Sequence, residues 1–344
     1  MPNTKPNILL IYTGGTIGMV KDFKTGALKA FNFKNLLNNI PELNLLDCNI
    51  ETVSFEHPID SSNMNPKYWV QTVEIIESHY KEFDGFVVLH GSDTMSYSAS
   101  ALSFMLENLA KPVIFTGSQL PIGDLRTDAK ENLITSIQLA SLQEKGKPII
   151  KEVCLYFEYK LYRGNRTTKL NAEHFQAFAS FNYPDLAESG VHLKINKEYL
   201  FEPNLKRKLK VHKNLDTNIA LIKLFPGISN SVIESIFNTN SLKAVILETY
   251  GAGNCTTEKW FLDVLKKNIS RGIHIINVTQ CSGGSVMMGH YETSSALKCI
   301  GVISGKDMTS EAALTKLMFL LGLNAKKVKT FKTTYEAPLR GEMS

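Results

Sequence analysis

The sequence predicts an α/β protein with a larger N-terminal domain built on a doubly wound sheet and a smaller C-terminal α/β domain of the Rossmann-like or flavodoxin-like kind. Short apolar runs alternate with amphipathic segments of helical period along most of the chain. Most of these runs end in a loop rich in Gly, Ser, Thr or Asp. The length of 344 residues is that of two domains, and the hydrophobic content of 43% suffices for a real core.

The N-terminal strand is the apolar run Asn7–Tyr12, which leads into the loop Thr13–Gly18. We expect a hairpin or flap over 19–28, because Thr25–Gly26 is a turn signal between two short extended pieces. The other N-terminal elements are expected to be strands at 50–55, 86–89, 112–115 and 152–159, and helices at 32–40, 68–80, after Thr94 and after Asp128.

Four polar loops follow strands of this domain, at residues 13–18, 60–63, 91–94 and 116–119. The right-handed crossovers of a parallel sheet should place these loops along one edge. Ligands of open α/β sheets bind at that edge. The first loop is glycine-rich but lacks the G-x-G-x-x-G spacing, the following helix and the Gly-Lys-Ser/Thr sequence of phosphate sites. Its glycines are therefore better explained as clearance around the hydroxyl of Thr16.

The C-terminal half repeats the alternation on a smaller scale. Expected strands are 218–224, 244–247 and 273–278, and expected helices are 229–237, 258–267 and 309–321. Residues 191–215 have the character of an extended connector, so we expect an N-terminal domain at 1–190 and a C-terminal domain at 216–344. The basic residues at 206–210 read as a solvated linker; contact with nucleic acid is the alternative, but no RNA-binding aromatic pattern accompanies them.

Composition excludes several classes of function. The net charge of +5, from 38 basic and 33 acidic residues, gives no reason to expect nucleic acid as a partner. The five cysteines form no Cys-x-x-Cys pair, which argues against a zinc cage or a disulfide framework and favours a cytoplasmic location. We expect no signal peptide and no membrane span, since no apolar stretch approaches about 20 residues. The Gly-x-Ser-x-Gly and His-Glu-x-x-His motifs are absent, so neither a serine elbow nor a metal site is expected.

Hydroxyl chemistry remains. The hydroxyl of Thr16 would need a base or relay, and Ser92–Asp93 offers a second hydroxyl and a carboxylate on a neighbouring loop. Asp93 could equally be the N-cap of the helix that follows. Lys169 could be a solvated surface residue or a proton carrier beside these groups, and spacing alone does not bring the three together. His90 is most simply a structural histidine at a strand end.

Several motifs together resemble the L-asparaginases. They are Thr13–Gly18, His90–Met95 and Thr116–Gln119, while Tyr162–Lys169 and Gln280–Gly283 are similar to the type I, cytoplasmic branch. The similarity covers nearly the whole chain. It implies an amidohydrolase that converts L-asparagine to aspartate and ammonia, without cofactor or metal, as a homodimer or homotetramer.

The resemblance also assigns residues. Thr16 would be the nucleophile, and Ser92, Asp93 and Lys169 a supporting triad. Asp60, Ser61 and Ser62 would hold the α-carboxylate and amino groups of the substrate, and Asp93 would pair with its ammonium.

This sequence departs from the family's pattern at three places. Serine occupies position 92 where threonine is usual, which keeps the hydroxyl but loses the stiffness of a β-branched side chain. The tyrosine of the flap aligns with Ala27, so Tyr12 or Phe23 would have to substitute for it. The arginine of an effector site aligns with Glu248, in a candidate site with Thr279, Gln280 and Cys281, and its carboxylate predicts weak or no activation by asparagine.

Two other functions stay open at this point. One is the asparaginase-like subunit of a tRNA-dependent amidotransferase, for which the expected small N-terminal domain has no counterpart before residue 7. The other is a non-catalytic amino-acid-binding module. Loss of ammonia release in Thr16→Val, with aspartate binding retained, would distinguish an enzyme from a binding module.

Overall fold

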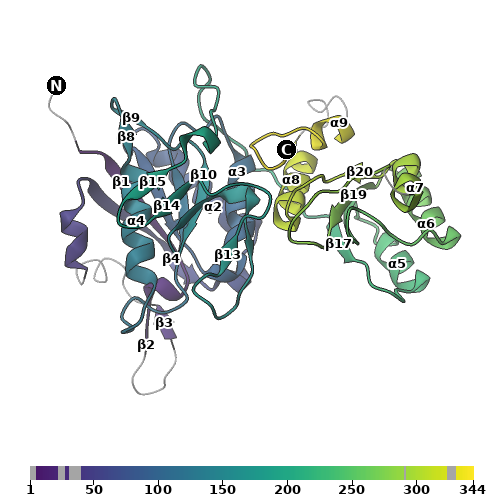
Figure 1. Cartoon of the computed structure of the whole chain (residues 1–344), viewed down its shortest axis with the longest axis horizontal. Helices are drawn as coiled ribbons and strands as arrows, with labels where there is room; N and C mark the ends of the chain where they lie inside the picture. The colour runs from purple at the N-terminus through teal and green to yellow at the C-terminus, as the bar shows by residue number, and fades with distance from the viewer. Residues whose placement is uncertain (1–4, 22–27, 31–39, 290–291, 324–330) are drawn as a thin grey trace. The chain divides into compact units, whose positions relative to one another are not determined.

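Both halves of the chain are α/β, as predicted. The structure is a computed structural model that describes residues 5–21, 28–30, 40–289, 292–323 and 331–344 (Figure 1). The chain divides into two compact units, Met1–Lys213 and Asn214–Ser344. Each is described by itself below.

The N-terminal unit is built on an eight-stranded mixed sheet. In spatial order its strands are β15 (Leu193–Ile195), β14 (Ala187–Ser189), β11 (Lys160–Arg163), β10 (Val153–Phe157), β7 (Val113–Thr116), β5 (Gly85–Leu89), β1 (Asn7–Gly14) and β4 (Asn49–Ile59). The five strands from β4 to β10 are parallel, in the order 2-1-3-4-5 of flavodoxin-like sheets.

Three antiparallel strands, β11, β14 and β15, extend this parallel sheet. The sequence pattern did not predict them. β11 is antiparallel because it returns from β10 through the two-residue turn Glu158–Tyr159, and so short a turn can join only antiparallel strands. Both turn residues have positive φ, 42° and 69°, which is unusual without glycine.

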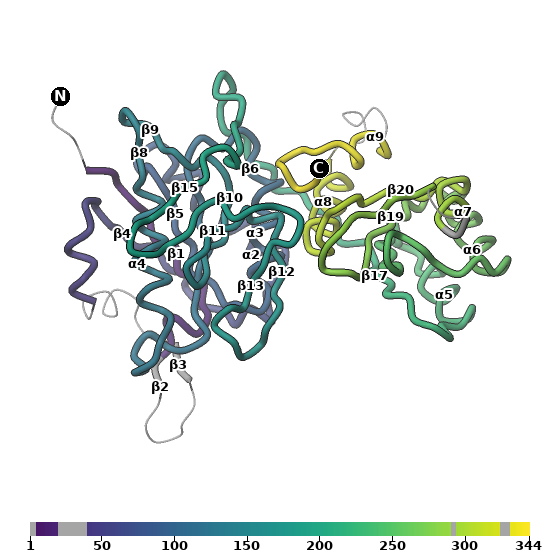
Figure 2. Tube along the Cα trace, in the orientation of Figure 1, coloured from purple at the N-terminus to yellow at the C-terminus, as the bar shows by residue number. Residues whose placement is uncertain are grey.

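Helices cover both faces of the sheet (Figure 2). They are α2 (Pro66–His79), α3 (Met95–Met105) and α4 (Ala129–Ser141). Alternate residues of β1 explain this arrangement. Ile8, Leu10 and Tyr12 join the apolar side chains of α4 in one buried cluster, while Leu9 and Ile11 are buried on the opposite face. A strand buried on both faces gives the continuous apolar run seen in the sequence.

Strand β4 is longer than predicted. It continues to Ile59 through His57 and Pro58, two residues expected in the loop. Proline is tolerated because β4 is the edge strand, where its missing N–H interrupts no ladder. The predicted helix at 32–40 lies outside the described residues except for Ile40. A 3-10 helix, η2 (Pro41–Leu45), begins directly after it.

Short pairs of strands complete this unit. They are β2 (Met19–Lys21) with β3 (Leu28–Ala30), β6 (Leu106–Glu107) with β16 (Lys210–Val211), β8 (Gln143–Glu144) with β9 (Lys147–Pro148), and β12 (Thr168–Lys169) with β13 (Phe178–Ala179). The β2–β3 pair confirms the predicted hairpin, whose turn at 22–27 lies outside the described residues. β15 and β16 both fall within the predicted connector 191–215, so parts of that segment pair with the N-terminal unit rather than running free.

The C-terminal unit has a four-stranded parallel sheet in sequence order, β17 (Ile219–Lys223), β18 (Ala244–Thr249), β19 (His274–Thr279) and β20 (Ile303–Ser304). Its helices are α5 (Asn230–Phe237), α6 (Lys259–Ser270), α7 (Glu292–Ile300), α8 (Ser310–Gly322) and α9 (Phe331–Tyr335). The predicted strands and helices of this half are present, whereas α7, α9 and β20 were not predicted. In the described part of the chain, no helix combines the length and the apolar character that crossing a bilayer requires.

Candidate active site

Four polar loops meet at the carboxyl edge of the large sheet, on either side of the point where its strand order reverses between β1 and β5. These loops pack closely against one another. A methyl group added to Gly15 would lie 2.5 Å from the Gly91 nitrogen, and one added to Gly91 would lie 2.5 Å from Ser61 Oγ. One added to Gly117 would collide with the His90 carbonyl oxygen. The loops therefore lie along one edge, as predicted, and only glycine allows them to pack so closely.

Three of these loops contain a single 3-10 turn. The turns are η1 (Thr16–Gly18), η3 (Ser61–Asn63) and η4 (Ser92–Thr94). Thr16, Ser61 and Ser92 are each the first residue of their 3-10 turn. Three hydroxyl side chains therefore occupy equivalent positions along the edge. Within the residues that the structure describes, strand β2 rather than an α-helix follows the first loop directly.

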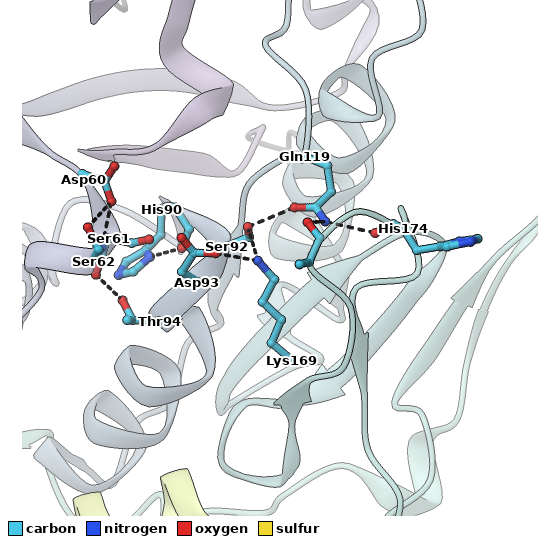
Figure 3. A network of polar contacts seen from close by, with 12 residues as sticks. Asp60, Ser61, Ser62, His90, Ser92, Asp93, Thr94, Gln119, Lys169 and His174 are labelled. Atoms are coloured by element: carbon cyan, nitrogen blue, oxygen red, sulfur yellow. Dashed lines mark hydrogen bonds and ion pairs between the residues drawn. The ribbon is translucent and has the colours of Figure 1, made fainter. Parts of the chain in front are cut away.

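Lys169 brings the second loop together with β12. Its Nζ donates to Ser92 Oγ at 2.9 Å and to Asp93 Oδ1 at 2.7 Å, across 77 and 76 residues of sequence (Figure 3). The lysine side chain is only 16% exposed. Lys169 is therefore not a solvated surface residue, which was one of the two interpretations that the sequence allowed. The carboxylate of Asp93 is 66% exposed and keeps room for a second cation.

The capping alternative for Asp93 is wrong. The N-cap of α3 is Thr94, whose hydroxyl donates to the Ser61 carbonyl at 2.7 Å instead of capping the helix. Asp93 lies one residue earlier, within η4, and its carboxylate accepts from Lys169. The contact between Thr94 and Ser61 ties the second loop to the Asp60–Ser62 loop.

Asp60 and Ser62 form a small polar turn of their own. Asp60 Oδ1 accepts from the Ser62 N–H and from the Ser62 hydroxyl, both at 2.8 Å. These two bonds hold the pKa of the Asp60 carboxyl below its usual range. Asp60 therefore stays ionised at neutral pH, next to Ser61.

Gln119 was not singled out from the sequence, yet it touches the same cluster. Its Oε1 accepts from Ser92 Oγ at 3.0 Å, and its Nε2 donates to the carbonyl oxygens of Ala172 and His174. A neutral amide carries no obvious chemical signal in a sequence. The available indications were its position at the end of the loop 116–119, at the same sheet edge, and its place in the motif Thr116–Gln119.

His90 is a buried structural residue, as expected. Its Nδ1 donates to the Gly91 carbonyl at 2.7 Å, which leaves Nε2 to accept from the Ser98 hydroxyl at 2.8 Å. Ser98 Oγ in turn accepts from Trp69 Nε1. Burial lowers the pKa of His90 to about 4, so the ring is neutral at neutral pH. The series of hydrogen bonds from Trp69 through Ser98 and His90 therefore ends at the Gly91 carbonyl of the second loop.

Thr16 is half-buried, and the residue before it in the chain is Gly15, which packs against Gly91. Tyr12, one of the suggested substitutes for the flap tyrosine, lies beneath this loop, and its hydroxyl donates to the Gly15 carbonyl at 3.5 Å. Burial raises the pKa of Tyr12 to about 12, so the phenol keeps its proton at neutral pH. Ala27 and Phe23 lie outside the described residues.

The candidate effector residues lie together at the carboxyl ends of β18 and β19. Gln280 Nε2 donates to the Glu248 carbonyl at 2.9 Å, and Thr279 Oγ1 donates to the Gly251 carbonyl at 2.6 Å. The Glu248 carboxylate accepts from Ser310 Oγ at 2.5 Å, while Cys281 is exposed.

The described residues contain no group of three or more His, Cys, Asp or Glu side chains arranged to hold a metal ion.

Comparison with known proteins places the fold and this edge in a family. Residues 7–200 match the family model described as asparaginase, N-terminal, and residues 218–333 match the glutaminase/asparaginase C-terminal domain. The chain is 43% identical over 342 residues to L-asparaginase 1 of Escherichia coli, a similarity that covers 99% of this chain and 98% of that protein.

Two further proteins are similar to this chain over nearly its whole length. The crystal structure of L-asparaginase I from Vibrio cholerae matches with a TM-score of 0.88 at 40% identity and covers 99% of both chains. The 60 kDa lysophospholipase of Mus musculus is 40% identical over 358 residues, which cover 98% of this chain and 62% of that protein. Since the matched models and relatives span both units, the chain belongs to the asparaginase/glutaminase family, in its type I branch.

Proposed function

We propose that the chain hydrolyses the side-chain amide of L-asparagine with Thr16 as nucleophile and with Ser92, Asp93 and Lys169 as its supporting triad. The observation that carries this proposal is the lysine contact: one ammonium group donates to both the Ser92 hydroxyl and the Asp93 carboxylate. A general acid–base relay needs such linked donors and acceptors within hydrogen-bond reach.

In the first half of the reaction, Thr16 Oγ1 attacks the amide carbon and its proton passes to the triad. Backbone N–H groups of the glycine loops stabilise the oxyanion of the tetrahedral intermediate. The C–N bond then breaks, and the nitrogen takes up a proton as it leaves as ammonia. An aspartyl ester on Thr16 remains. In the second half, water attacks the carbonyl carbon of this ester and gives a proton to the triad. The bond from that carbon to Thr16 Oγ1 then breaks, Thr16 takes a proton back from the triad, and aspartate is released.

The substrate is a zwitterion, so both of its charges must be paired in a small site. Asp60, Ser61 and Ser62 bind its α-carboxylate and amino groups through hydroxyl donors and the ionised carboxylate. Asp93 supplies a second negative charge for the ammonium, and the large exposed fraction of its side chain supports this role.

Thr16→Val tests the nucleophile. Valine keeps the branched shape and removes the hydroxyl, so we expect ammonia release from asparagine to fall at least about a thousandfold, with aspartate still bound in calorimetry. Lys169→Met should also lose activity. Lys160→Met is its matched control, because Lys160 pairs with Asp185 at 2.7 Å outside the proposed relay. Full activity in Thr16→Val would overturn the proposal, and no ammonia from the unaltered protein would overturn the enzyme assignment.

The proposal includes a cytoplasmic location and a homodimer or homotetramer, both taken from the family resemblance. Light scattering coupled to size-exclusion chromatography measures the oligomeric state, and a purely monomeric protein under assay conditions would contradict it.

A further inference from the structure

Gln119 connects the proposed catalytic groups to the segment that follows Lys169. Its Oε1 accepts from Ser92 Oγ at 3.0 Å, and its Nε2 donates to the carbonyl oxygens of Ala172 at 3.1 Å and His174 at 3.0 Å (Figure 3). One side chain thus touches Ser92 and the segment that directly follows Lys169.

The two carbonyl groups determine which end of the amide faces Ser92. A carbonyl oxygen only accepts, so the nitrogen end of Gln119 must face Ala172 and His174, and its oxygen end must face the serine. The Ser92 proton therefore lies on the bond to Gln119. Because a hydroxyl has one proton and two lone pairs, Ser92 Oγ accepts from Lys169 and keeps its remaining lone pair for a donor in the site.

Gln119 is itself held from behind. Its backbone N–H donates to the two carboxylate oxygens of Asp128, at 3.1 and 3.0 Å. Fully buried Asn132 donates to the same carboxylate at 3.2 Å and to the Gly117 carbonyl at 3.0 Å. The base of the side chain is therefore fixed to α4, which limits the directions in which the amide can point.

We propose that Gln119 is a positioning residue that sets the orientation of the Ser92 hydroxyl, a proposal that rests on the function proposed above for Ser92 and Lys169. Serine has no branch at Cβ, so its χ1 angle is free among three staggered positions. A β-branched residue is stiff at χ1. The hydrogen bond from Gln119 supplies by contact the restriction that the serine lacks in its own covalent structure.

Steady-state kinetics of Gln119→Met, measured with serine and with threonine at position 92, tests this proposal. Methionine has a similar length and makes none of the three side-chain hydrogen bonds of Gln119. With Ser92 we expect kcat to fall about tenfold and KM to stay within about twofold, because orientation of the hydroxyl affects the reacting state more than binding. In the Ser92→Thr background the same change should cost less than about threefold in kcat, because the branched side chain is already restricted.

Two further variants separate orientation from general structure. Gln119→Glu keeps the length of the side chain but sets a carboxylate oxygen against the carbonyl oxygens of Ala172 and His174, which repel it. With Ser92, kcat should therefore fall at least as far as in Gln119→Met. Asn196→Ala is the structural control. It removes another amide that donates to a backbone carbonyl, that of Asp185 at 2.8 Å, and should leave kcat and KM unchanged.

Equal losses in the two backgrounds, or a raised KM with kcat intact, would overturn the positioning role. An unaltered kcat in Gln119→Met would do the same, provided that Thr16→Val and Lys169→Met are inactive. If those two variants stay active, it is the proposed function that fails instead.

Discussion

At the scale of single residues, His90 shows how a buried polar group supports the site without joining the chemistry. Its ring is packed edge-on against Phe115 at a centroid distance of 5.8 Å and is fully hydrogen-bonded in the neutral form. Protonating it would place a second proton on Nε2, which then could no longer accept from Ser98. The buried charge would also lack a counter-ion among these contacts.

This arrangement predicts a pH dependence of stability. The pKa of His90 is about 4 in the folded protein against the ordinary 6.5, so the unfolded chain binds more protons between these values. Stability contributed by His90 is therefore full above about pH 6.5 and is lost as the pH falls toward 4, by about 3 kcal/mol. Urea unfolding at pH 7, 6 and 5 measures this slope. His90→Gln should flatten it, and an unchanged slope in that variant would rule out His90 as its source.

At the scale of elements, the close contact between the first and second loops depends on Gly15. This residue has φ 89° and ψ 169°, a conformation that is essentially restricted to glycine. Its Cα also faces the Gly91 backbone, as described above. The end of β1 can approach the end of β5 because Gly15 lacks a side chain, and the absent side chain of Gly91 leaves room for Ser61 of the neighbouring loop.

We predict that Gly15→Ala lowers the free energy of unfolding by about 3 kcal/mol, from combined backbone strain and overlap, and lowers kcat at least about a hundredfold. Gly146→Ala is the matched control. It also has positive φ, 73°, but open space where the methyl group would go, so it should cost only about 1 kcal/mol and no activity. Thermal and denaturant unfolding with ammonia assays compare the two, and equal effects would show that steric contact contributes nothing.

At the scale of the whole molecule, all of the proposed catalytic and substrate-binding residues belong to the N-terminal unit, and the candidate effector residues belong to the C-terminal unit. The strand order explains why the proposed catalytic and substrate-binding residues lie in the N-terminal unit. The large sheet reverses its order between β1 and β5, whereas the four strands of the C-terminal sheet follow the sequence without reversal.

We predict hyperbolic saturation by asparagine. The Glu248 side chain is 12% exposed and accepts from Ser310, and its charge would repel the carboxylate of an effector. Initial rates over a wide range of asparagine concentrations test this expectation. A sigmoidal curve that disappears on mutation of Glu248 or Cys281 would contradict it.

The polar edge of the sheet could be predicted from the sequence because local pattern and handedness determine it. The loops at 13–18, 60–63, 91–94 and 116–119 follow recognisable strands, and a parallel sheet leaves them one edge to share. The contact of Lys169 with Ser92 could not be derived in this way. The two residues are 77 positions apart, and a pairing of such long range carries no periodic signal; the family resemblance alone suggested it.

Other features were missed for related reasons. β11, β14 and β15 have three or four residues each, too few to display a period. The turn Glu158–Tyr159 contains no Gly or Asn, so the sequence carries no signal of the hairpin between β10 and β11. At this hairpin the sheet changes from parallel to antiparallel pairing. Gln119 was overlooked because an amide becomes informative only when its partners are known.

The two outer strands of the large sheet bear on how the protein behaves at high concentration. Strand β4 presents eleven residues of edge, with exposed Glu51 and Glu56 along it and Pro58 near its end. At the opposite border, β15 has three residues with exposed Lys194 in the middle. Charged side chains, a proline or a short length each make an edge strand a poor template for pairing with a further strand. The sheet is thereby protected against cross-pairing between copies, the first step toward amyloid-like aggregates.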